Sequence, residues 1–397
     1  MAKSRLLARP VEHIDVTAFD GRAVVDTYRS AAFQARNLAE GADVFAEMLE
    51  EPRGVVILTL AGSLVSAGLK EALLTLVECD MVDVIVATGA IVVDQDFFEA
   101  LGFRHYMAPG SVEAPVASDE ELRELGIDRI YDTYIDEAEL QVCDETVAQV
   151  LDGMAARAYS SREVVREMGQ YLARSHGDAR SIVLSAYRKD VPVFVPALSD
   201  SSAGFGAIAH RARASAAGLP HIAFDSAKDF HELARIKLAA PETGLLMVGG
   251  GVPKNFAQDA VVAARMLVEG GGEEGGDPGP ADIPMHKYAV QLTVADVRDG
   301  GLSGSTLREA TTWGKVETAR ERMVYGEATI TLSLLASDAY HRGIWRRREA
   351  RRLGRLFTGE PHGPESLARR PLAPEPPARQ PLGPGPPAHR GLAGGPT

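Results

Sequence analysis

Lys315 has the side chain with the most informative chemistry in this sequence. It lies two residues after Trp313 and behind Glu309, in the stretch Leu307–Lys315. A lysine is a nucleophile only as its neutral amine, and a desolvated position beside an aromatic ring favours that form. Glu309 and Trp313 are spaced i, i+4, as on one face of a helix. The segment therefore predicts an amine nucleophile in an aromatic pocket, although most lysines are solvated and most tryptophans belong to the core.

A second segment, Leu245–Asn255, reads as a strand, three glycines and then a helix. Glycines let a backbone approach a phosphate, and a helix N-terminus supplies unpaired N–H donors. The spacing is not G-x-G-x-x-G, so the usual Rossmann fingerprint is absent. A tight turn without a ligand explains Gly249–Gly251 equally well. Two other strand ends with glycines, near Ser63 and Gly89, favour a dinucleotide across the sheet edge.

Several acidic residues also follow strands. Asp200 is followed by Ser-Ser-Ala-Gly, a loop-like context that makes it the best ligand candidate among them. Asp94 and Asp96 are ambiguous, because an aspartate beside a helix often only caps it, as Asp96 could for a helix over residues 97–101. The ten histidines show no metal-ligand pairing, so we expect no metal site.

Helical patterns alternate with short apolar, β-branched runs along the chain. Helices are expected over Glu163–Ser175 and Phe256–Val268, and strands over Val55–Leu60, Val82–Ala87, Ser181–Ser185, Val193–Val195, His221–Phe224, Leu245–Val248 and Tyr288–Leu292. Such alternation predicts an α/β fold, a Rossmann-like doubly wound and mostly parallel sheet with helices on both faces. Ligands of such sheets bind beyond the carboxyl ends of the strands.

Composition restricts the possible partners. The 397 residues are 45% hydrophobic and carry a net charge of −13, which supplies a large core and argues against nucleic acid as a partner. The two cysteines, Cys79 and Cys143, cannot form a disulfide framework, so we expect a reducing cytoplasm. The N-terminus has no apolar run of the secretory type, and the most apolar stretch, 54–69, is too short to span a bilayer.

Two segments differ from the rest. Residues 269–284 are rich in glycine and acidic residues and read as a flexible insertion between a helix and a strand. Residues 346–397 begin with an arginine cluster, read as a solvated helix end, and continue into a Pro/Gly-rich tail that we expect to be disordered. Eleven of the 23 prolines lie beyond residue 358. We therefore expect one catalytic domain over residues 1–345.

The segment Glu309-Ala-Thr-Thr-Trp-Gly-Lys315 resembles the active-site segment of deoxyhypusine synthases, whose lysine forms a covalent imine. Five further segments match in the same order, namely Ala61–Ser66, Val82–Gly89, Pro192–Asp200, Gly249–Gly251 and Tyr325–Ala328. The resemblance runs from about residue 15 to 342 and excludes the insertion and the tail.

The resemblance implies a deoxyhypusine-synthase-like fold with NAD as cofactor and a polyamine as substrate. Lys315, Trp313 and Glu309 are then catalytic. The implied cofactor positions are Ser63, Leu64, Ser66, Thr88, Gly89, Asp200, Gly250, Gly251, Glu327 and Ala328. The implied substrate positions are Asp94, Asp96, Asn255, Asp259, Gly300 and Gly301. The resemblance also implies a homotetramer with active sites at a dimer interface.

Departures from the family bear on the substrate. Protein-modifying members carry Lys-His-His where this chain has Lys254-Asn255-Phe256, and Asn255 cannot act as a base. Phe205 and Leu302 replace carboxylates that bind ammonium, and Asp259 replaces an asparagine. The pattern resembles the bacterial branch associated with homospermidine- or spermidine-type products, so we expect a small amine acceptor. A true deoxyhypusine synthase acting on a translation-factor lysine and a non-catalytic NAD-binding protein are the alternatives.

Overall fold

The computed structural model describes residues 2–111, 115–240, 242–269 and 283–357. Its centre is a sheet of six parallel strands in the order β11-β10-β9-β1-β2-β7. These strands are β1 (Val55–Leu60), β2 (Val84–Ala87), β7 (Val193–Phe194), β9 (Thr243–Val248), β10 (Tyr288–Thr293) and β11 (Glu321–Tyr325). The predicted α/β class with a parallel sheet is confirmed.

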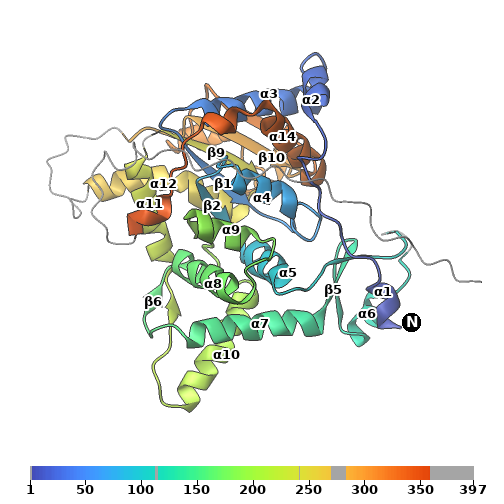
Figure 1. The fold of residues 1–397 in the computed structure, drawn as a ribbon. Coiled ribbons are helices and arrows are strands. Elements are labelled where there is room, and N and C mark those ends of the chain that lie inside the picture. The colour runs from blue at the N-terminus through green and yellow to red at the C-terminus, as the bar shows by residue number, and fades with distance from the viewer. Residues whose placement is uncertain (1, 112–114, 241, 270–282, 358–397) are drawn as a thin grey trace, which may run out of the picture. The chain divides into compact units, whose positions relative to one another are not determined.

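Helices cover both faces of this sheet (Figure 1). Side chains of β1 alternate between two cores, because Val56 and Leu58 belong to one cluster and Val55 and Ile57 to the other. The first cluster includes residues of α3 (Phe33–Glu50), α4 (Lys70–Glu78) and α14 (Ala328–Arg342). The second includes residues of α11 (Ser226–Ala239), α12 (Gly251–Glu269) and α13 (Leu307–Thr312). The sheet is therefore doubly wound.

The remaining elements surround this layer structure. The longer helices are α7 (Glu137–Asp152), α8 (Ser161–Ser175), α9 (Ile182–Lys189) and α10 (Ser202–Ala216). Short helices are α1 (Lys3–Leu6), α2 (Arg22–Tyr28), α5 (Phe98–Ala100) and α6 (Asp119–Glu124), with a π-helix at Ala90–Phe97 and 3-10 turns at Val297–Asp299, Ile344–Arg347 and Leu353–Phe357. Two small sheets pair β3 (Tyr106–Met107) and β4 (Ile127–Ile130) with β5 (Thr133–Asp136), and β6 (Ala158–Tyr159) with β8 (Ala223–Phe224).

Two predicted strands need correction. The apolar run at Ser181–Ser185 begins helix α9, in which Ser181 is the N-cap and accepts a hydrogen bond from the Leu184 N–H. A short apolar run has no distinguishing period, so the capping serine decides. The run at His221–Phe224 supplies only β8, which pairs with β6 outside the main sheet.

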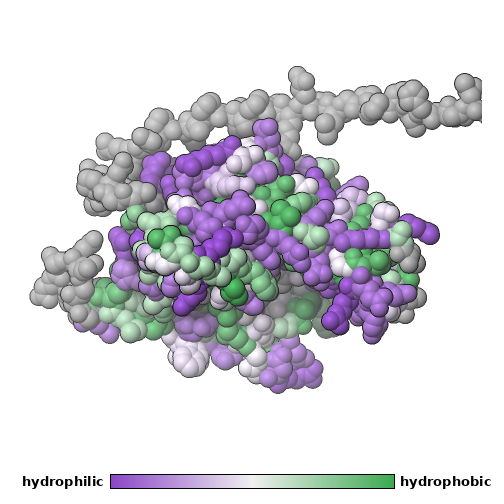
Figure 2. All heavy atoms as spheres, turned by 90° about the horizontal axis from the view of Figure 1, so that it is seen from below, coloured by the Kyte–Doolittle hydropathy of each residue, from purple (hydrophilic) through white to green (hydrophobic). Residues whose placement is uncertain are grey.

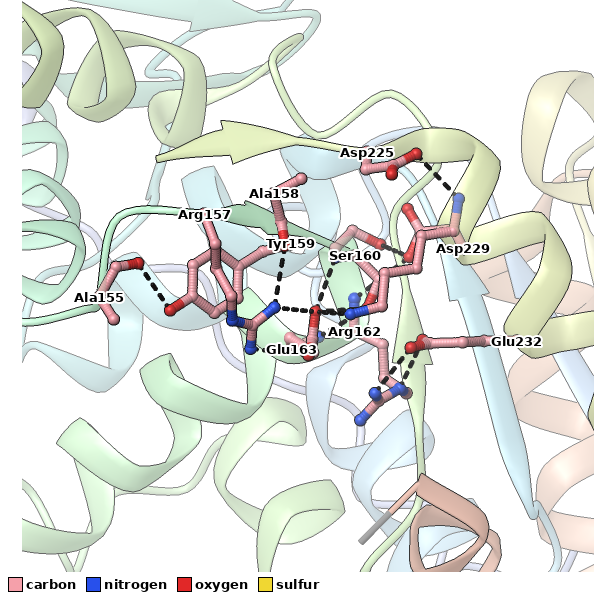
Figure 3. A network of polar contacts seen from close by, with 12 residues as sticks. Ala155, Arg157, Ala158, Tyr159, Ser160, Arg162, Glu163, Asp225, Asp229 and Glu232 are labelled. Carbon is pink, nitrogen blue, oxygen red and sulfur yellow. Dashed lines mark hydrogen bonds and ion pairs between the residues drawn. The ribbon is translucent and has the colours of Figure 1, made fainter. Parts of the chain in front are cut away.

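A polar network joins α8 to α11 (Figure 3), and it continues to the residue that follows the edge strand β7. The Ser161 hydroxyl accepts a hydrogen bond from Val195 N–H at 2.6 Å and donates to Asp229 at 2.8 Å. Next to it, Arg162 donates two hydrogen bonds to Glu232, at 2.7 and 2.9 Å, and both side chains are buried. These contacts fix the end of β7, from which the chain continues to Asp200.

Residues 346–357, which follow the predicted catalytic domain, pack against the rest of the fold. Arg348 is buried and ion-paired with Asp83, immediately before β2. Leu353 is buried in the second core cluster, and the Phe357 ring lies 4.3 Å from the Arg162 guanidinium. The arginine cluster therefore contributes buried contacts, where a solvated helix end was expected. The tail from residue 358 and most of the 269–284 insertion lie outside the described residues.

Hydrophilic side chains and apolar patches are interspersed on the face shown in Figure 2. Several large apolar side chains in the described part of the chain are exposed, including Phe205 and Ile208 on α10. Within the same residues, no helix is both long and apolar enough to cross a membrane.

Candidate active site

Lys315 is positioned by a tight turn at the end of α13. The turn needs Gly314, whose φ of +68° is unfavourable for other residues. A Cβ at this position would lie 2.7 Å from the Arg265 guanidinium, which donates to the Gly314 carbonyl at 3.2 Å. The Lys315 N–H then returns to the Ala310 carbonyl at 3.1 Å. The turn therefore brings the backbone of Lys315 back beside the last turn of α13.

The Lys315 ammonium lies in a compact polar cluster. Its Nζ is 2.6 Å from Asp259 Oδ1 and donates to Asn255 Oδ1 at 3.0 Å. Asn255 Nδ2 donates to Asp259 Oδ2 at 2.7 Å, which closes the set. Nζ also lies 5.3 Å from the centre of the Trp313 ring. The structure thus brings together four of the predicted residues, with the lysine side chain 10% exposed.

Lys254 is a second buried lysine near this cluster. Its Nζ donates to the Ser305 carbonyl, the Ser305 hydroxyl and the Leu302 carbonyl, at 2.5, 3.0 and 3.3 Å. Burial lowers its pKa to about 8; the charge of Glu309 opposes this shift and that of Lys315 adds to it. Lys254 therefore ties the 302–305 loop to α12, and Glu309 lies within electrostatic range of Lys254.

The glycine loop after β9 packs against its neighbours through its backbone. Gly249 and Gly251 have positive φ values of +76° and +61°. A Cβ at Gly250 would lie 2.5 Å from Ser303 Cα, so only glycine allows this approach. Gln291 of β10 donates to the carbonyls of Gly249 and Ser303, at 2.9 and 3.0 Å. Gly250 therefore permits contact between two loops, and Gly251 begins α12.

The ends of β1 and β2 carry the other predicted cofactor residues. Thr88 Oγ1 is buried and has no hydrogen-bond partner among the described residues. A Cβ at Gly89 would lie 2.5 Å from the Ser201 hydroxyl, so the loop after β7 packs directly on this turn. The Ser66 hydroxyl donates to the Ser63 carbonyl at 2.9 Å, and Leu64 is buried in the core. An unpartnered buried hydroxyl at a strand end is a polar position that a ligand can satisfy.

Carboxylates gather at the N-terminus of α10. Asp94 Oδ1 accepts from the Ser202 N–H at 2.6 Å. Burial raises the pKa of Asp94 to about 6; the charges of Asp144 and Asp200 contribute to this rise, and the hydrogen bonds from Ser202 oppose it. Asp200 is exposed. This group offers negative charge to an ammonium or to ribose hydroxyls.

Other predicted residues have local structural tasks. Asp96 is fully buried and accepts from the Ser181 hydroxyl and the Ile182 and Val183 N–H groups, at 2.7, 2.8 and 2.9 Å, so it holds the start of α9 and is not in the lysine cluster. Its interpretation as a substrate residue is therefore corrected.

Glu327 is the N-cap of α14, which begins at Ala328, and accepts from the Thr329 N–H. Gly300 has φ +71°, and the Gly301 N–H donates to Asp299.

The residues that replace family carboxylates are exposed. Phe205 is 64% and Leu302 40% exposed, and Trp313 is 67% exposed.

Three polar residues that organise the site were not predicted from the sequence. Gln291 joins two loops, Lys254 joins a loop to α12, and Gln95 accepts from the Val65 and Ser66 N–H groups at 3.0 and 3.1 Å. All three are buried, and Gln291 is a polar residue within an apolar strand, which is the signal that could have identified it.

Known proteins resemble this chain over most of its length. The profile of the family described as deoxyhypusine synthase matches residues 23–339. A deoxyhypusine synthase-like protein from Chlorobaculum tepidum is 50% identical over 361 residues, covering 91% of this chain and 98% of its own. A provisionally named deoxyhypusine synthase 2 from Methanosarcina mazei is 38% identical over 359 residues, covering 90% and 96%.

A crystal structure from Entamoeba histolytica, provisionally assigned as a deoxyhypusine synthase, superimposes with a TM-score of 0.50 at 15% identity, covering 83% of this chain and 97% of its own. That likeness concerns the fold alone. The fold is that of an α/β protein with a parallel sheet, and Lys315 pairs with Asp259 of α12. The chain belongs to the deoxyhypusine synthase family, a family of enzymes.

Proposed function

We propose that this chain is an NAD-dependent aminoalkyl transferase that moves a 4-aminobutyl group from a polyamine to a small amine. The observation that supports this most strongly is the Lys315 amine, buried between Asn255 and Asp259 and beside Trp313. An amine in such a place can form an imine with an oxidised amine carbon. Membership of the family supports the same reaction class.

The residues at the carboxyl end of the sheet fit NAD. Thr88 offers an unpartnered hydroxyl, Asp200 an exposed carboxylate and Gly251 the start of a 19-residue helix. A helix N-terminus favours a pyrophosphate, and carboxylates at strand ends favour ribose hydroxyls. NAD supplies a hydride acceptor and, as NADH, a hydride donor, so that an unreactive amine carbon becomes an imine and the product is reduced again.

The protein's own residues then carry the transfer. Lys315 attacks the oxidised carbon, expels the first amine and holds the aminobutyl group as a Schiff base until the acceptor displaces it. Trp313 and Glu309 line the approach, with the ring against methylenes and the carboxylate facing an ammonium.

A small acceptor is favoured by the charge around the site. Asn255 replaces a histidine, and Phe205 and Leu302 place apolar groups where carboxylates bind ammonium in protein-modifying members. The relative from Methanosarcina mazei keeps a second candidate open, a deoxyhypusine synthase acting on a translation-factor lysine.

The decisive assay offers both acceptors together. Each reaction contains the protein, NAD and a hypusine-type translation factor, together with either spermidine or putrescine. Mass spectrometry then identifies the products. We expect homospermidine- or spermidine-type products from the wild-type protein, none from Lys315→Arg, and little modified factor. Faster modification of the factor than of any free diamine would favour the second candidate. No product from any amine would instead favour a non-catalytic NAD-binding protein.

We also propose a cytoplasmic homotetramer. Exposed apolar side chains lie on the loops that follow β10 and on the turn beside Lys315, namely Val294, Val297, Leu302 and Trp313. A cluster of this kind suits a subunit interface next to the active site. Light scattering at micromolar concentration tests the assembly, and a fully active monomer would contradict it.

A further inference from the structure

The lysine cluster contains a carboxylate in the position of a proton acceptor. Asp259 Oδ1 lies 2.6 Å from Lys315 Nζ, within direct hydrogen-bonding distance. The other oxygen, Oδ2, accepts from Asn255 Nδ2 at 2.7 Å, so the carboxylate is held from both sides. Asn255 Oδ1 in turn accepts from Lys315 at 3.0 Å. Asn255 and Asp259 lie one turn apart on α12, which makes the arrangement rigid.

Other basic groups near this site are engaged elsewhere. His286 is fully buried; its ring bonds to Thr243 and to the Ala257 carbonyl, at 2.8 and 3.0 Å, and burial lowers its pKa to about 3. Lys254 is bound to the 302–305 loop. An amide such as Asn255 has no basic nitrogen. The geometry of a general base, direct contact with the proton to be moved, is met by Asp259.

We infer that Asp259 is the proton acceptor and donor for Lys315 in this chain, and that Asn255 is a positioning residue that orients both. This inference rests on the proposed function. The carboxylate takes one proton from the Lys315 ammonium, which leaves a neutral amine and a carboxylic acid. The amine attacks the carbon of the substrate iminium, and a new C–N bond to Lys315 forms as the bond to the departing amine breaks. One proton passes from the Lys315 nitrogen to the departing nitrogen and Asp259 returns its own proton there, so that the amine leaves as an ammonium and Lys315 is left as a protonated imine.

The arrangement also accounts for the two departures on α12. A carboxylate stands where the family has asparagine, and an amide stands where it has histidine. In this chain the proposed proton-transfer group is therefore the carboxylate at position 259, one helical turn after position 255.

Two measurements on the full chain separate a base from a merely structural residue. The first follows the rate of aminobutyl loading on Lys315 from spermidine and NAD, trapped with borohydride. The second follows alkylation of Lys315 by butanal and cyanoborohydride without NAD, as a function of pH. Variants are Asp259→Asn and Asp259→Glu, with Asp119→Asn, an exposed carboxylate paired with Arg129, as the matched control.

We expect Asp259→Asn to load the aminobutyl group at least about 100-fold more slowly, and Asp259→Glu to recover part of the rate. In the same Asp259→Asn protein, alkylation by butanal should persist and its pH midpoint should fall by about one unit, because a carboxylate partner stabilises the ammonium. Asp119→Asn should match the wild type in both assays.

Three results would overturn the inference: loading by Asp259→Asn at the wild-type rate, an unchanged butanal midpoint, or loss of loading and alkylation together. If the wild-type protein takes no aminobutyl group from any polyamine, the proposed function fails. The butanal comparison still decides whether Asp259 is coupled to Lys315 in that case.

Discussion

Two ion pairs around the central sheet use charged residues in different ways. At the amino end of the sheet, Arg348 and Asp83 form a pair with side chains 1% and 2% exposed, and Asp83 also accepts from the Val56 N–H at 2.8 Å. Beside α12, Lys315 pairs with Asp259, whose side chain is 26% exposed, next to the exposed Trp313. The first pair is enclosed, whereas the second opens towards solvent.

This difference separates stability from chemistry in one sheet. A buried pair bounded by backbone groups fixes the strands and leaves no group free to react. A lysine with a partly exposed partner can exchange that partner for a substrate. Substitutions around the two pairs can test this difference.

The largest effect on stability is expected at the amino end. Arg348→Ala leaves the Asp83 carboxylate buried without its partner and should lower the free energy of unfolding by about 3–5 kcal/mol. Arg347 is exposed, so Arg347→Ala should change the free energy of unfolding by less than about 0.5 kcal/mol. Urea denaturation of both variants tests this, and equal effects would show that the Arg348 pair is not a structural anchor.

A smaller effect is expected at the glycine loop. In Gly250→Ala the new Cβ would lie 2.5 Å from Ser303 Cα, so the loops must move, at a cost of about 1–3 kcal/mol. Stabilisation of the protein by NAD in a thermal shift assay should fall as well. Gly153→Ala is the control, because its Cβ would meet its nearest neighbour at 3.4 Å. A Gly250→Ala protein with wild-type stability and NAD response would argue against tight loop packing.

Asp94 gives the carboxyl end a pH dependence. Its pKa is raised to about 6 from 3.8, so the folded state holds this proton more tightly than the unfolded state. That contribution to stability is complete below pH 4 and is lost as the pH rises through 6. In Asp94→Asn, the fall in the free energy of unfolding between pH 4 and pH 7 should be smaller than in the wild-type protein by about 1–2 kcal/mol. This figure allows for the partial exposure of the carboxyl group. Denaturation at pH 4 and pH 7 measures it, and parallel declines in both proteins would contradict the assignment.

The two tryptophans should behave oppositely. Trp313 is 67% exposed, so Trp313→Ala should change the unfolding free energy by less than about 0.5 kcal/mol while raising the KM for a polyamine about 3- to 5-fold. Trp345 stacks on Tyr340 at 5.7 Å and donates to its carbonyl at 3.0 Å. Trp345→Ala should therefore destabilise the protein and leave KM unchanged. The reverse pattern would show that Trp313 is structural.

The parallel sheet could be predicted from the sequence because strands depend on local patterns. Apolar runs of strand length predicted most strands of the main sheet. The short motif around Lys315 predicted a nucleophile at that residue, but the contact of Lys315 with Asn255, 60 residues away, depends on the fold. Spacing of i, i+4 on a helix also places Asn255 and Asp259 together. The strands, the motif around Lys315 and the Asn255–Asp259 pair each involve residues that are close together in the sequence, so they can be predicted without long-range contacts.

Long-range partners could not be predicted in the same way. Asp96 resembles a ligand residue in sequence, but its partners are 85 to 87 residues away, at the start of α9. Arg348 belongs to a run of arginines typical of a solvated end, and only the fold brings Asp83 to it across 265 residues. The partner of a charged side chain, rather than its type, decides whether it is structural.

The central claim is that Lys315 is the nucleophile of an aminoalkyl transfer. The most direct measurement is borohydride reduction of the protein after incubation with spermidine and NAD, followed by peptide mass spectrometry. The account predicts an added aminobutyl mass on the peptide that contains Lys315, dependent on NAD, and none in Lys315→Arg, since a guanidinium stays protonated and cannot attack. An adduct on another lysine, or equal labelling in Lys315→Arg, would contradict it.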